Sequence, residues 1–197
     1  MEMMKGAVKG QVLRITNPSR YKYVRRLRPP RRELARQKKQ LISVLREKLA
    51  ENGMPNAKVF GRVKTLGSID RKEKYLKTAF PESWKKVLEE DLLALSVITD
   101  SKEQCYKTVG VLKSVGEFPE IDYDRPAKTN PRDFFGHVDK KGGLPKLQDV
   151  IVANLHVEGF SPIHVLVFTK ESYERTKANR WQYKTATQKM IKQGKKQ

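Results

Sequence analysis

The sequence predicts an α+β domain, in which helices pack against a mixed sheet of about five strands. Three observations support this. Segments of helical and of strand patterning alternate along most of the 197 residues. Hydrophobic residues make up 38% of the chain, which is enough for a core. No stretch approaches the roughly 18–20 apolar residues that a membrane span needs, and the first residues lack the apolar run of a signal peptide. We therefore expect a cytoplasmic protein without a membrane contact.

The charge of the chain predicts an anionic partner. Lys and Arg number 42 against 22 Asp and Glu, a formal net charge of +20. Such a surface attracts nucleic acid, nucleotides or acidic lipids, although a solvated basic surface that only maintains solubility is the alternative. Cys105 is the only cysteine, which excludes an intrachain disulfide and a Cys-rich zinc site.

The N-terminal part of the chain is its most basic segment. Ten Lys and Arg and a single acid, Glu33, lie between Arg20 and Lys39. Pro29-Pro30 interrupts this segment, so it cannot form one continuous helix. We expect a basic N-terminal arm over residues 1–30, extended around Tyr21 and Tyr23. A folded domain over residues 31–184 and a basic C-terminal tail over residues 185–197 should follow.

A long helix is predicted to open the folded domain. Apolar residues recur near the helical period between Arg31 and Asn52, and Gly53 with Pro55 ends the pattern. A short strand is expected from Lys58 to Val63. The next helix should begin at Gly67-Ser68, with Ser68 as a candidate N-cap, and continue to about Lys77.

The second half of the chain alternates in the same way. The 92–99 segment is an apolar run of strand length, and Asp100 or Ser101 can cap the helix that follows. Residues 116–143 are rich in Pro, Gly, Asp and Lys and predict a long loop, which in a compact domain is usually functional or mobile. In order, the expected elements are a helical turn at Glu82–Leu88, a strand at Leu92–Thr99, a helix at Lys102–Leu112, strands at Val150–Val157 and Ile163–Thr169 joined by a turn at Glu158-Gly159, and a basic helix from Lys170 to about Ile191.

The segment between the first strand and its helix is a candidate phosphate site. Arg62 and Lys64 are two residues apart on a strand, hence on one face of it, and Lys72 lies one turn beyond the helix start at Ser68. Cations from a strand edge and a helix N-terminus together suit a triphosphate. A solvated basic corner of the surface is the alternative. Asp91, at the start of the second strand, suits Mg²⁺ chemically, although a carboxylate there can also be a simple cap.

These residues resemble the synthetase domain of the RelA/SpoT family of nucleotide pyrophosphokinases. That family has Arg-x-Lys, Ser-Ile and Lys at the spacings of Arg62, Lys64, Ser68-Ile69 and Lys72, which the resemblance assigns to the phosphates of the donor ATP. The second motif, an aspartate opening a buried strand before a Cys-Tyr helix, matches at Asp91 and Cys105-Tyr106. The resemblance makes Asp91 the Mg²⁺ ligand and implies a nucleotidyltransferase-like synthetase fold.

The acceptor half of the resemblance is partial. The stretch from Asp122-Tyr123 to Lys128 and Asn130 is similar to the approach to the family's acceptor loop, but the Gly-Tyr that should follow is absent. Phe134 is a candidate for stacking on the acceptor base in its place, beside the alternative of a loop-anchoring Phe.

The last strand departs further from the family pattern. The family has Glu-x-Gln-x-Arg-Thr where this chain has His164, Leu166 and Phe168 before Thr169, and an arginine where it has Ser96. Trp181, Tyr183 and Lys184 fit the family's last helix. A satisfied structural histidine is the alternative to a catalytic role for His164, since no acid, Cys or second His lies beside it.

The resemblance implies transfer of pyrophosphate from ATP to the 3′-hydroxyl of a guanine nucleotide or a tRNA 3′ end, as in alarmone (ppGpp) synthesis in the stringent response, with Mg²⁺ as cofactor. It places Asp91 and His164 in the catalytic site and Lys128, Asn130 and Phe134 at the acceptor. The second hypothesis is a catalytically inactive module of this fold that binds RNA, a ribosome or a partner protein through its basic surface.

Overall fold

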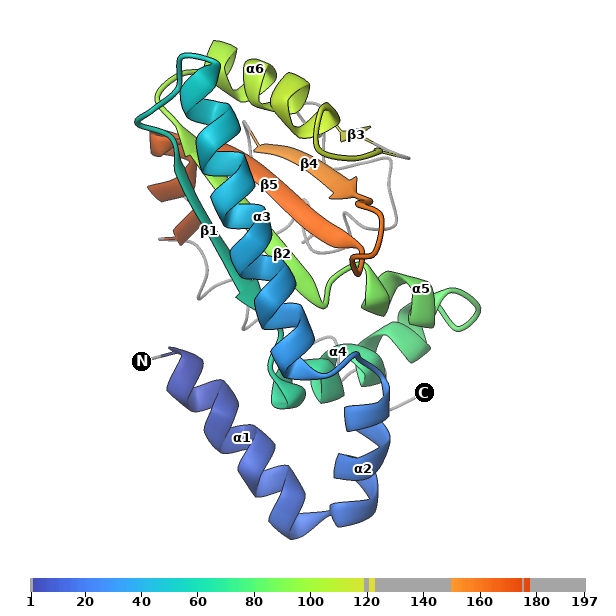
Figure 1. Ribbon diagram of the computed structural model, residues 1–197. Coiled ribbons are helices and arrows are strands. Elements are labelled where there is room, and N and C mark those ends of the chain that lie inside the picture. Colours follow the sequence, from blue (N-terminus) through green and yellow to red (C-terminus); the bar gives the residue numbers. More distant parts are fainter. Residues whose placement is uncertain (1, 119–120, 123–149, 175, 178–197) are drawn as a thin grey trace, which may run out of the picture.

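A five-stranded mixed sheet forms the centre of the molecule. The computed structural model describes residues 2–118, 121–122, 150–174 and 176–177. The strands lie in the order β1-β2-β5-β4-β3 (Figure 1). The bounds of the strands are Lys58–Val63 for β1, Leu93–Thr99 for β2, Ile121–Asp122 for β3, Val150–Leu155 for β4 and Ile163–Thr169 for β5. The α+β fold class with a mixed sheet of about five strands is therefore confirmed.

The register of the sheet aligns residues from four strands in one row. Central strands β2 and β5 are parallel, whereas β1 and β4 pair antiparallel to them on either side. Arg62 lies opposite Ala94, Ala94 opposite His164, and His164 opposite Asn154. Because directly opposed residues project to the same side of a sheet, this row shares one face.

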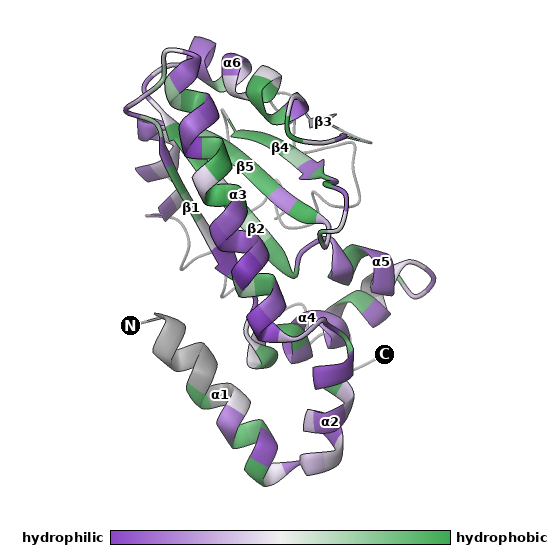
Figure 2. Cartoon of the chain, viewed as in Figure 1, coloured by the Kyte–Doolittle hydropathy of each residue, from purple (hydrophilic) through white to green (hydrophobic). Residues whose placement is uncertain are grey.

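Two helices cover the other face of the sheet. Helices α3 (Arg31–Glu51) and α6 (Lys102–Lys113) both pack on strand β2, and they contact each other. Alternate residues of the central strands point towards them, which Figure 2 shows as hydrophobic strands behind α3. Burial of these side chains is the main stabilising term of the fold. Fully buried members of this layer include Leu34, Leu45, Leu93, Leu95, Val97, Leu112, Ile163, Val165 and Val167.

Gly61 allows helix α3 to approach strand β1 closely. A Cβ atom at this position would lie 2.6 Å from Leu95 Cδ2 and 3.0 Å from Lys38 Cγ of α3. The first distance is shorter than any normal contact, and the Leu95 side chain has no free space in which to move because it is fully buried. The glycine between Phe60 and Arg62 thus sets the distance between the long helix and the strand that precedes the candidate phosphate site.

The N-terminal residues form two helices rather than an extended arm. Helix α1 spans Glu2–Thr16 and helix α2 spans Pro18–Arg26, with Asn17 as the N-cap of α2. Both contact helix α4 (Leu66–Ala79), below the sheet in Figure 1. The expectation of an extended chain around Tyr21 and Tyr23 is therefore wrong. Pro18 stands at the first helical position, where its ring favours a helix and its missing N–H costs no hydrogen bond.

A cluster of ion pairs attaches α2 to α4. Arg20 Nε donates to Asp70 Oδ1 at 2.7 Å, and the same guanidinium pairs with Glu73. Glu73 is only 1% exposed and also accepts from Tyr23 Oη at 3.1 Å and from Lys77 Nζ at 2.7 Å. A buried carboxylate needs such partners, since an unpaired one would be strongly destabilising. Part of the basic N-terminal segment therefore serves as the counter-charge for α4.

Most remaining elements lie close to their predicted positions. Strands 58–63 and 163–169 have the expected bounds, helix α5 spans Trp84–Glu89, and Ser101 caps α6 by accepting from the Gln104 N–H. The N-cap of α4 is Thr65 rather than Ser68, because the helix begins earlier, at Leu66. The predicted loop 116–143 contains β3, which pairs with β4. The predicted last helix begins as expected, since residues 170–174 and 176–177 are helical, and the rest of it lies outside the described residues. No helix in the described residues is both long and apolar enough to cross a membrane.

Candidate active site at the β1–α4 corner

Three sequence-distant segments meet at the end of strand β1. The backbone N–H of Lys64 donates to Leu92 O at 2.9 Å, which extends the pairing of β1 and β2 by one residue beyond β1. The chain then turns at Thr65 into helix α4, whose second turn carries Lys72. Asp91 follows α5 and lies two residues before Leu93, the buried first residue of β2. Backbone geometry therefore brings two lysines and one carboxylate to a single corner of the sheet.

The two lysines share one carboxylate oxygen. Lys64 Nζ and Lys72 Nζ both donate to Asp91 Oδ2, and Lys64 Nζ also lies 3.4 Å from the Asp91 carbonyl oxygen. The side chains of all three residues are between 12% and 16% exposed. Two positive charges held within reach of one negative charge leave an excess of positive charge at a largely dehydrated position. Such a position favours an additional anion, because the low local dielectric strengthens the attraction.

The pKa values at this corner reflect the same balance of burial and charge. Burial lowers the pKa of Lys64 to about 7, with the charge of Lys72 acting in the same direction and Asp91 opposing it. Burial alone would raise the pKa of Asp91, but Lys64 and Lys72 hold it far below its ordinary value. Asp91 is therefore ionised at all physiological pH values, whereas Lys64 can lose its proton near neutrality.

Arg62 and Ser68 lie on either side of Lys64 in the sequence. Among the described residues, neither forms a hydrogen bond or ion pair with Asp91. The exposed side chain of Arg62 is close enough to Lys64 and His164 to lower the pKa of both. Half-buried Ser68, in the first turn of α4, shares a 3.0 Å hydrogen bond with the Thr65 hydroxyl. Sequence analysis assigned Arg62, Lys64, Ser68 and Lys72 to one phosphate site. In the structure, Arg62 lies near the end of β1 and Lys64 directly after it, and Ser68 and Lys72 lie in the first two turns of α4.

His164 lies on strand β5, within the electrostatic influence of the lysine–aspartate cluster. Burial lowers its pKa to about 4, which Asp91 opposes and Lys72, Lys64 and Arg62 reinforce. The imidazole is therefore neutral at pH 7. Its Nδ1 atom lies 3.2 Å from Asn154 Oδ1 on the neighbouring strand β4. A neutral imidazole with one nitrogen already hydrogen-bonded has the other nitrogen available for chemistry.

Two polar residues of this region, Asn154 and Glu90, were not predicted from the sequence. Asn154 is 3% exposed and Glu90 is 7% exposed, and Asn154 Nδ2 lies 3.5 Å from Glu90 Oε2. The one available signal was Asn154 itself, a polar residue within the apolar strand Val150–Leu155. Nothing in the sequence around Glu89-Glu90 distinguishes the buried Glu90 from the exposed Glu89.

The acceptor side of the predicted site lies largely outside the described residues. Lys128, Asn130 and Phe134 all belong to the 123–149 segment, and Trp181, Tyr183 and Lys184 belong to the 178–197 segment. Ser96, at the position of a family arginine, is half-buried on β2 and lies between Phe60 and Leu166 in the sheet register.

The donor set for a metal ion is a single carboxylate. Across the described residues, no group of three or more His, Cys, Asp or Glu side chains could hold a metal. Mg²⁺ is commonly bound by one or two carboxylates together with substrate phosphates rather than by a protein cage. Asp91, ionised and next to a position suited to phosphate, fits that second type of site, in which the metal arrives with the nucleotide.

Comparisons with known proteins give matches to solved structures only. No family model and no curated protein match the chain. It is similar to the small alarmone synthetase 1 from Bacillus subtilis bound to its product pppGpp, with 17% identity, TM-score 0.48, and coverage of 89% of this chain and 92% of that chain. A GTP pyrophosphokinase family protein from Streptococcus pneumoniae shows 13% identity, TM-score 0.45, and coverage of 83% and 82%.

A second structure of small alarmone synthetase 1 from Bacillus subtilis shows 14% identity, TM-score 0.43, and coverage of 83% of this chain and 87% of that chain. All three neighbours are small alarmone synthetases or GTP pyrophosphokinase family proteins, and all three TM-scores are below 0.5. At these identities the likeness concerns the fold alone.

Proposed function

We propose that this protein is an ATP-dependent pyrophosphotransferase of the RelA/SpoT type, which transfers the β,γ-pyrophosphoryl group of ATP to the 3′-hydroxyl of a nucleotide or of a tRNA 3′ end. The observation that carries the proposal is the cluster in which Lys64 and Lys72 share Asp91 Oδ2 at the β1–α4 corner. Arg62, from the same strand, adds a fourth charge beside it.

The cluster supplies what phosphoryl transfer requires of a protein. The transition state concentrates negative charge on phosphate oxygens, so catalysis depends on cations fixed in position before the reaction. Lys64, Lys72 and Arg62 are such cations, and the strand and helix that carry them are parts of the packed domain. Helix α4 begins at the same corner, and the positive end of a helix dipole favours a nearby anion.

Mg²⁺ is part of this proposal as a companion of ATP. Asp91 would hold it, together with oxygens of the nucleotide. When bound, it would neutralise charge on the transferring phosphates.

The reaction can be written with the residues of this chain. The acceptor hydroxyl oxygen forms a bond to the β-phosphorus of ATP, and the bond from that phosphorus to the oxygen bridging to the α-phosphorus breaks, so that AMP leaves. The hydroxyl proton goes to a general base, which we assign to the free ring nitrogen of His164. Burial lowers the pKa of His164 to about 4, so the imidazole is unprotonated at pH 7 and can accept the proton, as a weaker base than an ordinary histidine.

Donor binding is the first experiment. Isothermal titration of ATP–Mg²⁺ into the wild type should show binding, and Lys64→Ala should weaken it at least tenfold, since it removes a largely buried phosphate contact. Lys58→Ala is the matched control, because Lys58 is an exposed lysine on the same strand but outside the cluster. Equal binding by Lys64→Ala and Lys58→Ala would contradict the donor-site assignment.

Product analysis is the second experiment. ATP–Mg²⁺ is incubated with GDP, GTP, ADP or tRNA, and pyrophosphorylated products are separated by charge. We expect weak or absent transfer to GDP and GTP, because the Gly-Tyr acceptor turn and the strand glutamate of the resembled family are replaced here. Robust transfer to GDP that is lost in Asp91→Ala but intact in His164→Ala would show that His164 does not occupy the catalytic position.

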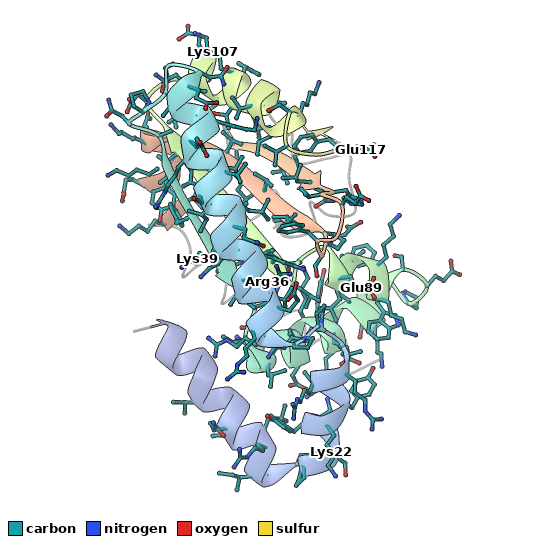
Figure 3. All side chains as sticks on the ribbon, viewed as in Figure 1. Lys22, Arg36, Lys39, Glu89, Lys107 and Glu117 are labelled. Carbon is teal, nitrogen blue, oxygen red and sulfur yellow. The ribbon has the colours of Figure 1, made fainter. Side chains whose placement is uncertain are left out.

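A second candidate function is anion binding through the basic surface without catalysis. Arg28, between α2 and α3, supports it: its Nε and Nη1 atoms are buried without a hydrogen-bond partner in the described structure, and burial lowers its pKa, with Arg31 and Arg25 adding to the effect. Exposed Lys22, Arg36 and Lys39 extend the basic surface along α2 and α3 (Figure 3). If ATP does not bind at all, this function, with RNA, a ribosome or an acidic protein as partner, becomes the preferred one.

A further inference from the structure

A chain of three polar side chains runs through the described sheet beside the candidate active site. It begins at Glu90, just before β2, continues through Asn154 on β4, and ends at His164 on β5. Glu90 and Asn154 are 7% and 3% exposed, whereas His164 is only partly buried. Asn154 stands between buried Ala153 and Leu155. It is the one polar residue of the strand Val150–Leu155, and its side chain hydrogen-bonds to both Glu90 and His164.

The chemistry of each group sets the direction of the hydrogen bonds. A carboxylate only accepts hydrogen bonds, so the Asn154 group that faces Glu90 must be its NH₂. The carbonyl oxygen Oδ1 of Asn154 therefore faces His164, and it too can only accept. The imidazole must consequently donate from Nδ1, at the 3.2 Å contact. In a neutral ring the proton then resides on Nδ1, and Nε2 carries the lone pair.

Burial disfavours the opposite orientation of the Asn154 amide. If the Asn154 amide rotated, its NH₂ would face the histidine and its carbonyl would face the carboxylate, placing two acceptors together at a position shielded from water. The sheet register holds the participants in place, because Asn154 and His164 are directly opposed on neighbouring strands. The pair is therefore fixed by backbone pairing as well as by its own hydrogen bond.

We propose that Glu90 and Asn154 are positioning residues that hold His164 in the Nδ1–H tautomer, so that Nε2 presents its lone pair to the acceptor hydroxyl. The role in transfer rests on the proposed function, whereas the tautomer does not. During transfer the proton of the hydroxyl moves to Nε2 as the oxygen bonds to the β-phosphorus and AMP departs. Asn154 then stabilises the resulting imidazolium, whose Nδ1–H continues to donate to Oδ1.

The tautomer can be measured without any reaction. Long-range ¹H–¹⁵N correlation spectra of protein labelled at its histidines distinguish Nδ1–H from Nε2–H rings at pH 7. His164→Gln assigns the signal, and His156→Gln, which removes an exposed histidine of the same region, is the matched control. We expect the Nδ1–H pattern for His164 in the wild type. An Nε2–H ring in the wild type would overturn the proposal.

Two variants test the chain itself. Glu90→Gln keeps the shape of the side chain but can donate as well as accept, so the Asn154 amide loses its preferred direction. Asn154→Ala removes the connection. In both we expect the His164 ring to shift towards the Nε2–H tautomer that imidazole prefers in water, with backbone spectra otherwise retained. An unchanged Nδ1–H pattern in folded Glu90→Gln and Asn154→Ala would overturn the proposal.

A kinetic test uses whichever of GDP, GTP, ADP or tRNA accepts the pyrophosphoryl group. Glu90→Gln should lower kcat about tenfold or more while KM for ATP stays unchanged, because the donor phosphates contact other residues. Combined with His164→Gln, it should add no further loss, since both act through one group. An additive loss would show that Glu90 acts independently of His164. If the wild type transfers nothing, the proposed function fails while the tautomer measurement still decides the arrangement of the chain.

Discussion

Lys64 is the residue at which burial, charge and ligand binding are most tightly linked. Its ammonium group is held at a largely dehydrated position by one carboxylate that it shares with Lys72. Its lowered pKa means that the ligand-free protein has only a weak hold on that proton above neutral pH. A phosphate group placed beside it favours the charged form, so ligand binding and proton binding must depend on each other.

The first prediction is proton uptake on ATP binding. Because the pKa of Lys64 is about 7 without ligand, the lysine is largely neutral at pH 8 and largely charged at pH 6. ATP–Mg²⁺ binding should therefore take up as much as about one proton at pH 8 and almost none at pH 6, and affinity should decline as pH rises through 7. Titration calorimetry in buffers of different ionisation enthalpy measures this uptake. It should vanish in Lys64→Ala and persist in Lys58→Ala; equal uptake in all three would exclude Lys64 as its source.

The second prediction separates two roles of Asp91. As a counter-ion, the carboxylate competes with phosphate for both lysines, so Asp91→Asn should bind ATP more tightly than the wild type when Mg²⁺ is absent, by about tenfold. As a metal ligand, it should make ATP binding depend on Mg²⁺, and the variant should lose that dependence. Calorimetry with and without Mg²⁺ tests both roles, with thermal unfolding as a check of the fold. Weaker Mg²⁺-free binding in the variant would mean that Asp91 instead holds the lysines in a binding geometry.

At the scale of secondary-structure elements, the sequence was informative wherever local patterning determines the outcome. Strands 58–63 and 163–169 and helix 31–51 have strong alternation or a strong apolar stripe, and their predicted bounds agree with the structure to within a residue. Helix α2 was missed because its stability comes from Asp70 and Glu73, some fifty residues away in the chain. Strand β3 was missed because two residues carry no period, and their pairing with β4 is non-local.

In the candidate site too, the residues that local sequence spacing groups were predictable, and those brought together by the sheet were not. Spacing along one strand and one helix grouped Lys64 with Lys72, and the apolar run after Asp91 placed it at a strand start. The roles of Asn154 and Glu90 depend on burial and on sheet register, which no spacing reveals. His164 was recognisable as a polar residue on a strand face, but the atom it donates from is visible only with its neighbours in place.

The third prediction concerns the attachment of α2 to α4. Replacing Arg20 by Gln removes one of several partners of buried Glu73 and one partner of Asp70. Because Lys77 and Lys74 still pair with these carboxylates, the free energy of unfolding should fall by only about 2 kcal/mol rather than the larger cost of an unpaired buried charge. Urea denaturation measures the loss. Arg36→Gln, which breaks an exposed pair with Glu33, is the control and should leave stability nearly unchanged. Equal stabilities of the two variants would show that α2 is not held by Arg20.

For the whole molecule, the docking of α1 and α2 changes how the basic surface must be tested. Deleting the residues before Arg31 would remove two helices that pack on α4, along with the counter-charges of Glu73 and Asp70. A loss of RNA binding after such a deletion would not distinguish lost charge from lost structure. Exposed cations can instead be neutralised one group at a time.

The fourth prediction is the salt dependence of RNA binding. If RNA binds electrostatically, each phosphate contact contributes a slope of about −0.7 to −0.9 in log K against log salt concentration. Neutralising exposed Lys22, Arg25 and Arg26 to Gln should make the slope shallower by about two for single-stranded RNA, with little dependence on sequence. Fluorescence anisotropy over a salt series measures it. Gln at Lys107 and Lys113, exposed on α6, is the control; an identical slope in both variants would exclude α2 from the interface.

The parallel pairing of β2 with β5 has a consequence for the order in which the protein folds. Residues 93–99 and 163–169 become neighbours only after a long chain loop has closed, which is entropically costly and slow. Strands β4 and β5, by contrast, form a local hairpin. We expect the hairpin to form early and to join β2 as one body in a late folding step, which pulsed hydrogen exchange would detect as late protection of the β2 amides that pair with β5. Until that step, His164 and Asp91 have no fixed relation. A ribosome-bound chain that ends before residue 163 would therefore contain Lys64, Lys72 and Asp91 but not His164. The row of opposed residues across β1, β2, β5 and β4 could not yet form in it.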